Sequence, residues 1–297
     1  MSEGPAGLWP AQSGDGPPSR GYVVADVFTD TPLQGNQLAV FTDGRGLPGE
    51  HMQRVARELN LSETVFFLPP EQGGDVRVRI FTPASELPFA GHPVLGSAFL
   101  AAELLELETV RLETGSGLVP VVLRRENGQV VSGRMEQPIP AWEPYEHAGR
   151  LLAAVGVAES GLPVEVYRNG PRHVYVALPD EAAVAALRPD LGALAGLGEI
   201  GVSCFAGGGR RWKTRMFGPG LGVAEDPATG SAAGPLAVHL ARHGRTGFGE
   251  EIEIRQGAEI GRPSVLYATA EGSAREIGRV LVGGSAVVVA RGQYRLG

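Results

Sequence analysis

The chain has 297 residues, about twice the length of a typical domain, which favours two domains of about 150 residues each. It carries 26 Lys and Arg against 33 Asp and Glu, so its net charge is −7 and its pI is near 5.5, which argues against nucleic acid or an anionic membrane as a partner. Glycine (44 residues) and proline (23 residues) are abundant, but an apolar content of 43% is enough for an ordered, turn-rich globular core.

Two residue types are scarce, and their scarcity limits the chemistry. Cys204 is the only cysteine, which excludes an intramolecular disulfide, a multi-thiolate zinc site and a paired-thiol mechanism within one chain. We therefore expect a cytoplasmic protein. Lys213 is the only lysine, and we do not expect it to form a Schiff base. The longest apolar stretch, Leu281 to Ala290, is far shorter than the roughly 20 residues that span a bilayer, so no membrane partner is expected.

In chain order, residues 1–20 are rich in Gly, Pro and Ser and resemble a flexible leader more than a signal peptide. Up to residue 68, the apolar pattern predicts three strands and one amphipathic helix, namely a strand at 22–28, a strand at 38–41, a helix at 50–59 and a strand at 65–68. A turn at Gln34-Gly35-Asn36 joins the first two strands.

The chain contains an internal repeat. Residues 62–83 align without a gap on residues 198–219 at a spacing of 136 residues, so that Arg79, Phe81 and Pro83 match Arg215, Phe217 and Pro219. After a slip of two residues, PVLGSA from Pro93 aligns with PATGSA from Pro227. Strand-turn-helix units in one protein often look alike, but two matching blocks in the same order favour a duplication.

Both copies have the same predicted secondary structure. Apolar and charged residues alternate at 76–80 and 212–216, which predicts a half-buried strand in each copy. Apolar helices are expected to follow at 94–105 and 228–240, opened by Pro93 and Pro227. His92 and Asp226 precede those prolines and are expected to cap the two helices.

The segment Gln137 to Tyr145 contains three prolines, which predicts a stiff linker between the copies. We therefore expect four parts, which are a leader at 1–20, an N-terminal domain at 21–136, a linker at 137–149 and a C-terminal domain at 150–297. Whether the last strand returns to the first domain is left open. Strands dominate, with one principal buried helix in each half. This predicts an α+β fold of two pseudo-symmetric domains, each a curved sheet around a central helix.

Glu63 is the candidate general base. It stands between a helix and an apolar strand, with Leu61 and Phe66 close by in the sequence. Apolar surroundings raise the pKa of a carboxyl group towards the range that is useful for proton transfer. The alternative is an ordinary exposed charge. The repeat aligns Glu63 with Glu199, which we interpret as a coincidence because the neighbours of Glu199 are less apolar.

The second candidate feature is the start of the helix in the C-terminal copy. Small residues at Gly230, Ser231 and Ala232 leave the backbone N–H groups of the first turn accessible, and the helix dipole adds partial positive charge there. An acidic ligand group would fit, although capping and close packing are the simpler alternative. If a pseudo-twofold relates the halves, both helix N-termini can point into an interdomain cleft, where a small carboxylated substrate would bind.

Histidines offer a further acid/base group. His92 can carry a proton near neutral pH, whereas Asp226 would remain a carboxylate unless desolvated, and a purely structural pairing of the two is equally open. His239 and His243 are four residues apart, but Leu240 stands where a zinc protease carries Glu, so we expect a solvated helix face and no metal site. The sequence contains neither a P-loop nor a G-x-S-x-G motif.

Six sequence blocks, taken together and in order, resemble the phenazine biosynthesis PhzF family. They are Asp26-Val27-Phe28-Thr29, Gly35-Asn36, Asn60-Leu61-Ser62-Glu63-Thr64, Glu86-Leu87-Pro88-Phe89-Ala90-Gly91-His92-Pro93, Arg215-Met216-Phe217 and Glu225-Asp226-Pro227-Ala228-Thr229-Gly230-Ser231. The resemblance implies the diaminopimelate epimerase-like fold, in which two similar domains each contain a central helix and the active site lies between them.

The resemblance also implies an activity, which is that of an isomerase without a cofactor. The family's glutamate moves a proton between carbons of a cyclic substrate, and the matching residue is Glu63. By the same matching, His92, Asp226 and Ser231 would orient the substrate and assist proton transfer. Backbone N–H groups at Gly91 and Gly230 would hold its polar atoms, and the protein would be a homodimer.

The hypothesis from the sequence is a cytosolic isomerase of secondary-metabolite biosynthesis. In it, Glu63 removes an acidic C–H proton from a small carboxylated substrate and returns it elsewhere on the same face. One alternative is an epimerase or hydro-lyase of the same superfamily, with His92 or Asp226 as the opposing acid. The other is a non-catalytic protein that binds a small acid.

Overall fold

The computed structural model describes residues 19–295, and the chain divides into two compact units. Of the described residues, 19–135 and 283–295 form the N-terminal unit, and 136–282 form the C-terminal unit. The chain therefore passes from one unit to the other twice. Most of the expected leader, residues 1–18, lies outside the described residues, whereas Ser19 and Arg20 already belong to the first strand.

The N-terminal unit is built mainly of strands, with two helices. In chain order its elements are β1 (Ser19–Val27), β2 (Asn36–Phe41), α1 (Gly49–Leu59), β3 (Glu63–Leu68), β4 (Val76–Phe81), β5 (Glu86–Leu87), α2 (Gly91–Leu105), β6 (Thr109–Thr114), β7 (Gly117–Glu126), β8 (Gln129–Gln137) and, after the whole C-terminal unit, β18 (Ala286–Arg295).

The C-terminal unit has the same mixture of elements and more short helices. Its elements are β9 (Ala141–Pro144), α3 (Ala148–Val155), β10 (Glu165–Arg168), β11 (Arg172–Ala177), α4 (Glu181–Ala186), α5 (Leu191–Ala195), β12 (Gly201–Gly208), β13 (Arg211–Gly218), η1 (Pro219–Leu221), β14 (Val223–Asp226), α6 (Gly230–Arg242), β15 (Glu251–Gln256), η2 (Ala258–Ile260), β16 (Ser264–Gly272) and β17 (Ile277–Gly284).

The two units share one order of strand pairing. In the N-terminal unit the pairs are β1–β2 antiparallel, β2–β3 parallel, β3–β4 antiparallel, β4–β5 antiparallel, β4–β6 parallel and β6–β7 antiparallel. The C-terminal unit repeats all six as β10–β11, β11–β12, β12–β13, β13–β14, β13–β15 and β15–β16. Likewise β18 pairs antiparallel with β1, as β9 does with β10. The topology therefore repeats, as the sequence alignment predicts.

One pair of side chains is repeated along with the topology. The guanidinium of Arg79 on β4 makes two hydrogen bonds of 2.7 Å to the carboxylate of Glu86 on β5. In the C-terminal unit Arg215 makes the same two bonds, each 2.8 Å, to Glu225. Each guanidinium also lies over the phenylalanine two residues along its own strand, at 5.1 Å from the Phe81 ring and 4.9 Å from the Phe217 ring.

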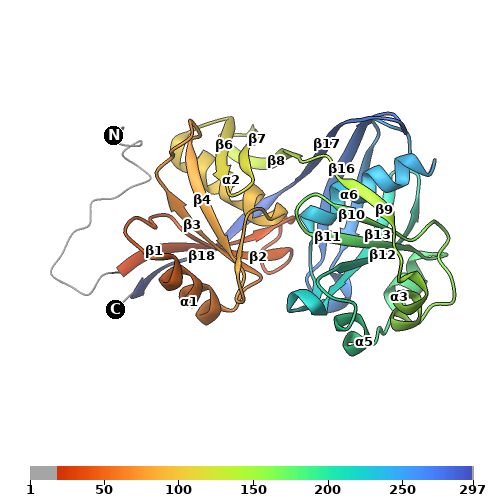
Figure 1. Cartoon of the computed structure of the whole chain (residues 1–297). Coiled ribbons are helices and arrows are strands. Elements are labelled where there is room, and N and C mark those ends of the chain that lie inside the picture. The colour runs from red at the N-terminus through yellow and green to blue at the C-terminus, as the bar shows by residue number, and fades with distance from the viewer. Residues whose placement is uncertain (1–18, 296–297) are drawn as a thin grey trace. The chain divides into compact units, whose positions relative to one another are not determined.

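Each unit wraps its strands around one long helix, α2 in the N-terminal unit and α6 in the C-terminal unit (Figure 1). Residues 91–102 of α2 and 230–241 of α6 are all buried, and a helix that is apolar on every side belongs in a core. In contrast, α1 buries only Met52, Val55 and Ala56 on one face. The predicted α+β fold, with one principal buried helix in each half, is confirmed.

The segment expected to be a linker, residues 137–149, forms regular structure. Strand β9 pairs with β10, with Trp142 opposite Tyr167, and α3 begins at Ala148. The prolines that suggested a linker are compatible with this strand, because a proline at the end of a strand need not interrupt a ladder. Pro144 is the last residue of β9.

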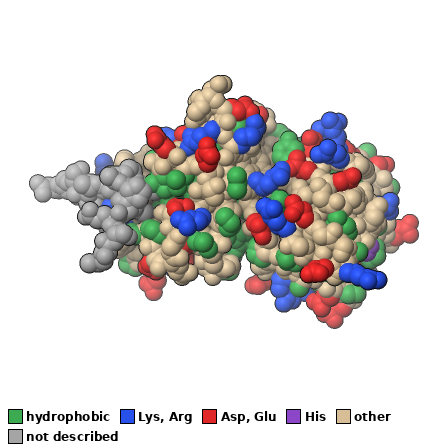
Figure 2. All heavy atoms as spheres, turned by 90° about the horizontal axis from the view of Figure 1, so that it is seen from above, with side chains coloured by type: hydrophobic (Ala, Val, Ile, Leu, Met, Phe, Trp, Pro, Cys, Tyr) green, Lys and Arg blue, Asp and Glu red, His purple; other side chains and the backbone are tan. Residues whose placement is uncertain are grey.

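The surface mixes charges of both signs. On the face shown in Figure 2, the Lys and Arg side chains lie close to Asp and Glu side chains. Several exposed ion pairs contribute, such as Arg77–Glu71 and Arg279–Glu136. Within residues 19–295, no helix is both long enough and apolar enough to cross a bilayer.

Candidate active site

Glu63 and His92 lie side by side in the N-terminal unit. Glu63 is the first residue of β3, and His92 is the second residue of α2. The Oε2 atom of Glu63 is 3.1 Å from the Nε2 atom of His92, and the two side chains are 14% and 6% exposed. A carboxylate and an imidazole at this distance, with little solvent around them, can hold or exchange a proton.

Burial keeps the His92 ring neutral. It lowers the pKa of His92 to about 3, although a hydrogen bond to the backbone of Gln37 acts in the opposite direction. The Nδ2 atom of buried Asn36 lies 3.3 Å from the other ring nitrogen, Nδ1. The tautomer of the ring decides whether Nδ1 accepts from the Asn36 amide or carries the proton itself. His92 is therefore a neutral ring whose Nε2 atom lies 3.1 Å from the Glu63 carboxylate.

A tight turn places Asn36 beside the pair. Gly35 has φ 67°, and a Cβ atom at this position would lie 2.4 Å from the carbonyl oxygen of Val27. Only glycine fits both the left-handed backbone and the close approach. The turn delivers Asn36 to the start of β2, which runs parallel to β3 with Leu38 in register with Glu63.

The expected helix caps are wrong in both halves. Helix α2 is preceded by Ala90 and α6 by Thr229, so His92 lies inside the first turn and Asp226 ends β14. The prolines misled the prediction, since Pro93 is the third residue of its helix and Pro227 precedes its helix altogether. Consequently His92 presents its ring from within a helix, and Asp226 presents its carboxylate from a strand end.

A polar network holds Asp226 in the C-terminal unit. Its Oδ2 accepts a hydrogen bond of 2.6 Å from the hydroxyl of Thr229. The buried amide of Gln256 donates to the backbone carbonyl of Asp226 at 2.7 Å and to the Thr229 hydroxyl at 2.9 Å. The loop between β14 and α6 is thus held in one conformation, with Asp226 only 8% exposed.

Ser231 and Gly230 form the first turn of α6. The Oγ atom of Ser231 is 3.0 Å from Nε2 of His173, a buried residue of β11. Two amides bind the backbone of this turn, since Gln137 donates to the Gly230 carbonyl at 2.9 Å and Asn169 donates to the Ser231 carbonyl at 3.1 Å. The N-terminal turn of α6 is therefore fixed from several sides.

The structure groups the candidate residues within each unit. It brings Glu63 together with His92 at the start of α2, where Gly91 is the first helical residue. Separately, it gathers Asp226, Gly230 and Ser231 at the start of α6. Glu199, the repeat partner of Glu63, is exposed, so the two glutamates differ as expected.

Sequence reasoning gave no role to several polar side chains that contact these residues. They are Asn36, Gln137, Asn169, His173 and Gln256. Only Asn36 carried a signal, because it belongs to the Gly35-Asn36 block of the family resemblance. The others reach their partners across long stretches of chain, 58 residues for His173 and 93 for Gln137, and no local pattern reveals such contacts.

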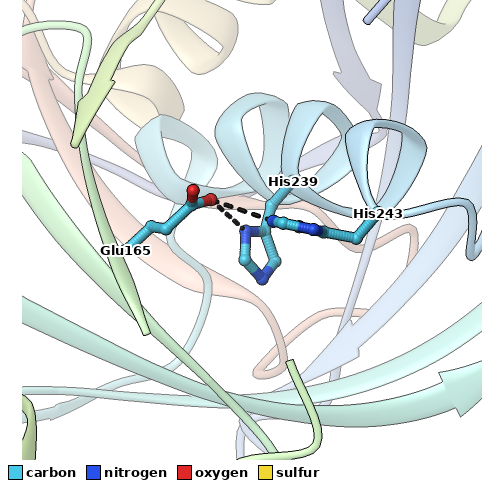
Figure 3. A group of neighbouring side chains, drawn as sticks. All are labelled: Glu165, His239 and His243. Carbon is cyan, nitrogen blue, oxygen red and sulfur yellow. Dashed lines mark hydrogen bonds and ion pairs between the residues drawn. The ribbon is translucent and has the colours of Figure 1, made fainter. Parts of the chain in front are cut away.

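A second cluster of ionisable residues joins β10 to the end of α6 (Figure 3). The Oε2 atom of Glu165 lies 3.2 Å from Nδ1 of His239 and 3.0 Å from Nε2 of His243. The helix face predicted to be solvated is therefore partly buried, and His239 has no exposed surface. The prediction failed because α6 is covered on all sides, which the spacing of two histidines cannot show.

This cluster suits a metal ion poorly. The same Oε2 atom also accepts hydrogen bonds from Arg242 at 2.8 Å and from the hydroxyl of Tyr167 at 2.9 Å. A metal-ligating histidine normally donates its second N–H, but Nε2 of His239 has no hydrogen-bond partner among the described residues. Burial raises the pKa of Glu165, but these four donors outweigh it and hold that pKa well below its usual range. The cluster is a network of hydrogen bonds and ion pairs that joins β10 to α6.

Thiol chemistry has no place at either group of residues. Cys204 is buried in β12, and burial raises the pKa of its thiol to about 12. The starts of α2 and α6 carry Gly91-His92 and Gly230-Ser231, so neither supplies a thiolate.

Two halves of one topology, each built around a buried helix, define the class of epimerase-like α+β proteins. A hydroxyproline epimerase from Agrobacterium vitis has this fold, with a TM-score of 0.63 at 14% identity over 93% of this chain and 91% of that one. A solved structure from Pseudomonas aeruginosa, described as a predicted epimerase, is nearer, with a TM-score of 0.79 at 33% identity over 93% of this chain and 99% of that one.

The sequence comparisons are more specific. The family model PhzC-PhzF, described as phenazine biosynthesis-like protein, matches residues 25–292. A trans-2,3-dihydro-3-hydroxyanthranilate isomerase of Pseudomonas aeruginosa is 54% identical over 275 residues, which is 93% of this chain and 99% of that protein. The chain belongs to the PhzC-PhzF family and is a PhzF-like isomerase.

Proposed function

We propose that the protein isomerises trans-2,3-dihydro-3-hydroxyanthranilate, or a close relative of it, in the biosynthesis of phenazine-type secondary metabolites. The similarity to the Pseudomonas aeruginosa isomerase supports this substrate. The observation that carries the mechanism is the contact of 3.1 Å between the Glu63 carboxylate and the His92 imidazole.

Glu63 is the proposed general base and then the general acid. Its carboxylate takes a C–H proton from the ring, and the electron pair of that bond delocalises into the conjugated double bonds of the substrate. The resulting carboxylic acid returns the proton to another ring carbon, so one C–H bond breaks, one forms and no oxidant or reductant is needed. Neutral His92, with Nε2 3.1 Å from the Glu63 carboxylate, is proposed to keep that carboxyl group aimed at the substrate.

The remaining residues are proposed to bind the substrate. The start of α6 offers backbone N–H groups at Gly230 and Ser231 with the positive end of a helix dipole, which suits a substrate carboxylate. The N–H of Gly91 at the start of α2 is assigned the same kind of role, because it is also the first helical residue of a buried helix. Asp226, held by Thr229, is proposed to accept a hydrogen bond from an amino or hydroxyl group of the substrate and to assist proton transfer.

Isotope exchange tests the role of Glu63. In deuterated water the wild-type enzyme should place deuterium on the product carbon that receives the proton. Glu63→Gln should abolish this incorporation and lower kcat by roughly 10²- to 10⁴-fold, because the amide cannot take a proton. Glu199→Gln is the matched control, since Glu199 is the exposed repeat partner, and it should behave as wild type. Wild-type exchange in Glu63→Gln would contradict the assignment.

An epimerase is the second candidate function, because a solved relative at 33% identity is described as a predicted epimerase. Product analysis by NMR separates the two reactions. An isomerase moves the double bonds of the ring, whereas an epimerase inverts one carbon and leaves the bonding pattern unchanged. A hydro-lyase would release water instead.

We also propose a homodimer in the cytosol. Free Cys204, buried in β12, needs no oxidising compartment, and the family resemblance supports a dimer. Sedimentation of the purified protein at micromolar concentration should give the mass of two chains, and a single-chain mass would overturn this.

A further inference from the structure

The hydroxyl of Ser231 has a buried histidine as its partner. His173 lies on β11, is 1% exposed and places Nε2 3.0 Å from the Ser231 Oγ atom. Ser231 itself is 7% exposed. Either the imidazole or the hydroxyl can donate the hydrogen bond between them. Because both groups are buried and have few other partners, the direction of this bond matters.

The surroundings of His173 decide that question. The other ring nitrogen, Nδ1, has no hydrogen-bond partner among residues 19–295. It packs against Gly201, where a Cβ atom would come within 2.6 Å of it. A buried N–H group without an acceptor is rarer and costlier than a buried acceptor without a donor. The ring proton therefore belongs on Nε2, and burial, which lowers the pKa of His173 to about 4, keeps the ring neutral.

This tautomer leaves the hydroxyl proton of Ser231 available to another acceptor. When Nε2–H donates to Oγ, the Ser231 O–H is not used by His173 and is free to donate elsewhere. The backbone of Ser231 cannot turn away, because Asn169 donates to its carbonyl at 3.1 Å. The position of Oγ is thus held before any ligand arrives, and its proton is available to a ligand.

We propose that His173 is a positioning residue of this isomerase, which holds the Ser231 hydroxyl as a hydrogen-bond donor to the carboxylate of the substrate. The inference rests on the proposed function, because it deepens the role given there to Ser231. His173 acts through Ser231 and does not touch the substrate. Its removal therefore weakens carboxylate binding and leaves the proton transfer at Glu63 largely intact.

Glutamine and asparagine at position 173 differ in side-chain length, so only one of them can reach the Ser231 Oγ atom. In His173→Gln the amide nitrogen lies about as far from the backbone as Nε2 and can still donate to Oγ, whereas the shorter amide of His173→Asn cannot. We expect His173→Gln to bind anthranilate, a stable aromatic carboxylate, within about threefold of wild type, and His173→Asn to bind it roughly tenfold more weakly. Equal affinities of the two variants would overturn the proposal.

A double-mutant cycle, with binding of anthranilate measured by calorimetry and turnover measured separately, completes the test. Ser231→Ala should weaken binding by roughly 10- to 100-fold, and adding His173→Asn to it should change nothing further, because the histidine acts only through the hydroxyl. In turnover, His173→Asn should raise KM and leave kcat within about threefold. A full tenfold loss from His173→Asn in the Ser231→Ala background would refute the proposal. Calorimetry keeps this outcome separate from a failure of the proposed function, which Glu63→Gln and isotope exchange decide.

Discussion

At the scale of single residues, burial decides the protonation of two histidines near the candidate site residues. The pKa of His92 falls to about 3 and that of His173 to about 4, both through desolvation. Each ring is therefore neutral at physiological pH, with one donor and one acceptor nitrogen. For His173, whose Nδ1 has no hydrogen-bond partner among the described residues, the donor nitrogen is Nε2.

The role of Asn36 leads to a testable change. In Asn36→Asp the new carboxylate can only accept, so it holds the His92 ring proton on Nδ1 and leaves Nε2, the atom 3.1 Å from the Glu63 carboxylate, without a proton. We expect kcat to fall by roughly 10²-fold, with a smaller change in KM. Nitrogen NMR of labelled histidine should show the ring proton on Nδ1 in the variant. An unchanged tautomer together with an unchanged kcat would contradict the network.

The candidate residues of the site could be proposed from the sequence, but the side chains that contact them could not. Glu63 and His92 stand in short motifs, and their proximity follows from the order of a strand and a helix that the motifs mark. Asn169 and Gln256 lie in unremarkable sequence, 62 and 27 residues from the groups they bind. A single amide side chain in a loop or strand gives no sequence pattern, because its partners are known only from the folded structure.

At the scale of elements, helix α6 shows how a proline can be accommodated in a buried helix. Pro235 lies inside α6 and has no N–H, so the carbonyl of Ser231, four residues earlier, loses its helical partner. The amide of Asn169 supplies the missing donor at 3.1 Å. The same turn receives Gln137 at the Gly230 carbonyl and Tyr175 at the Ala232 carbonyl, the latter at 2.7 Å.

This substitution of a side-chain donor for a backbone donor predicts a coupling. Asn169→Ala leaves the buried Ser231 carbonyl without that donor and should lower the free energy of unfolding by about 1–3 kcal/mol. In a Pro235→Ala background a backbone N–H becomes available, so the cost of Asn169→Ala should shrink markedly. Denaturant titration of the four proteins measures both values. Equal costs in the two backgrounds would show that Asn169 does not replace the helical bond.

The elements themselves were largely predictable, and their ends were not. Period-two alternation located β4 and β13, and the apolar runs located α2 and α6. The prediction of the cap residues was wrong because proline is allowed anywhere in the first helical turn and also just before it. The expectation of a linker at 137–149 was wrong because prolines fit the end of a short strand as well as a linker.

At the scale of the whole molecule, the two halves keep one architecture and carry different chemistry. The Arg79–Glu86 and Arg215–Glu225 pairs occur at equivalent strands of the repeat, so they belong to the shared framework. The first turns of the two helices differ, since α2 begins with Gly91-His92 and α6 with Gly230-Ser231. The topology is therefore shared, and the residues at the two helix starts are not. The repeat could be seen in the sequence because residues of the shared framework, such as Arg79 and Arg215, are the same in both halves.

Buried neutral histidines also make the stability of the molecule depend on pH. Unfolded histidine titrates at its ordinary pKa, about 6.5, whereas His92 and His173 titrate in the folded state at about 3 and about 4. Between these values only the unfolded chain binds the protons, so stability falls as the pH drops below about 6.5. At about pH 5 each histidine should cost about 2 kcal/mol relative to about pH 7.5.

Urea midpoints at the two pH values measure this loss. His173→Gln removes one of the titrating groups and should lose about 2 kcal/mol of the pH dependence. A pH dependence as large as that of wild type in His173→Gln would mean that His173 is not buried as a neutral ring.

Strand β18 has a consequence for how the chain acquires its shape during synthesis. It pairs with β1 along the length of both strands, from Ser19 opposite Arg295 to Val27 opposite Ala286. Every residue of the C-terminal unit leaves the ribosome before β18 does. The second half can therefore fold as a continuous stretch, while the first half waits with β1 flanked on one side only. The N-terminal unit is therefore translated first, but its sheet is completed only after the C-terminal unit has been synthesised.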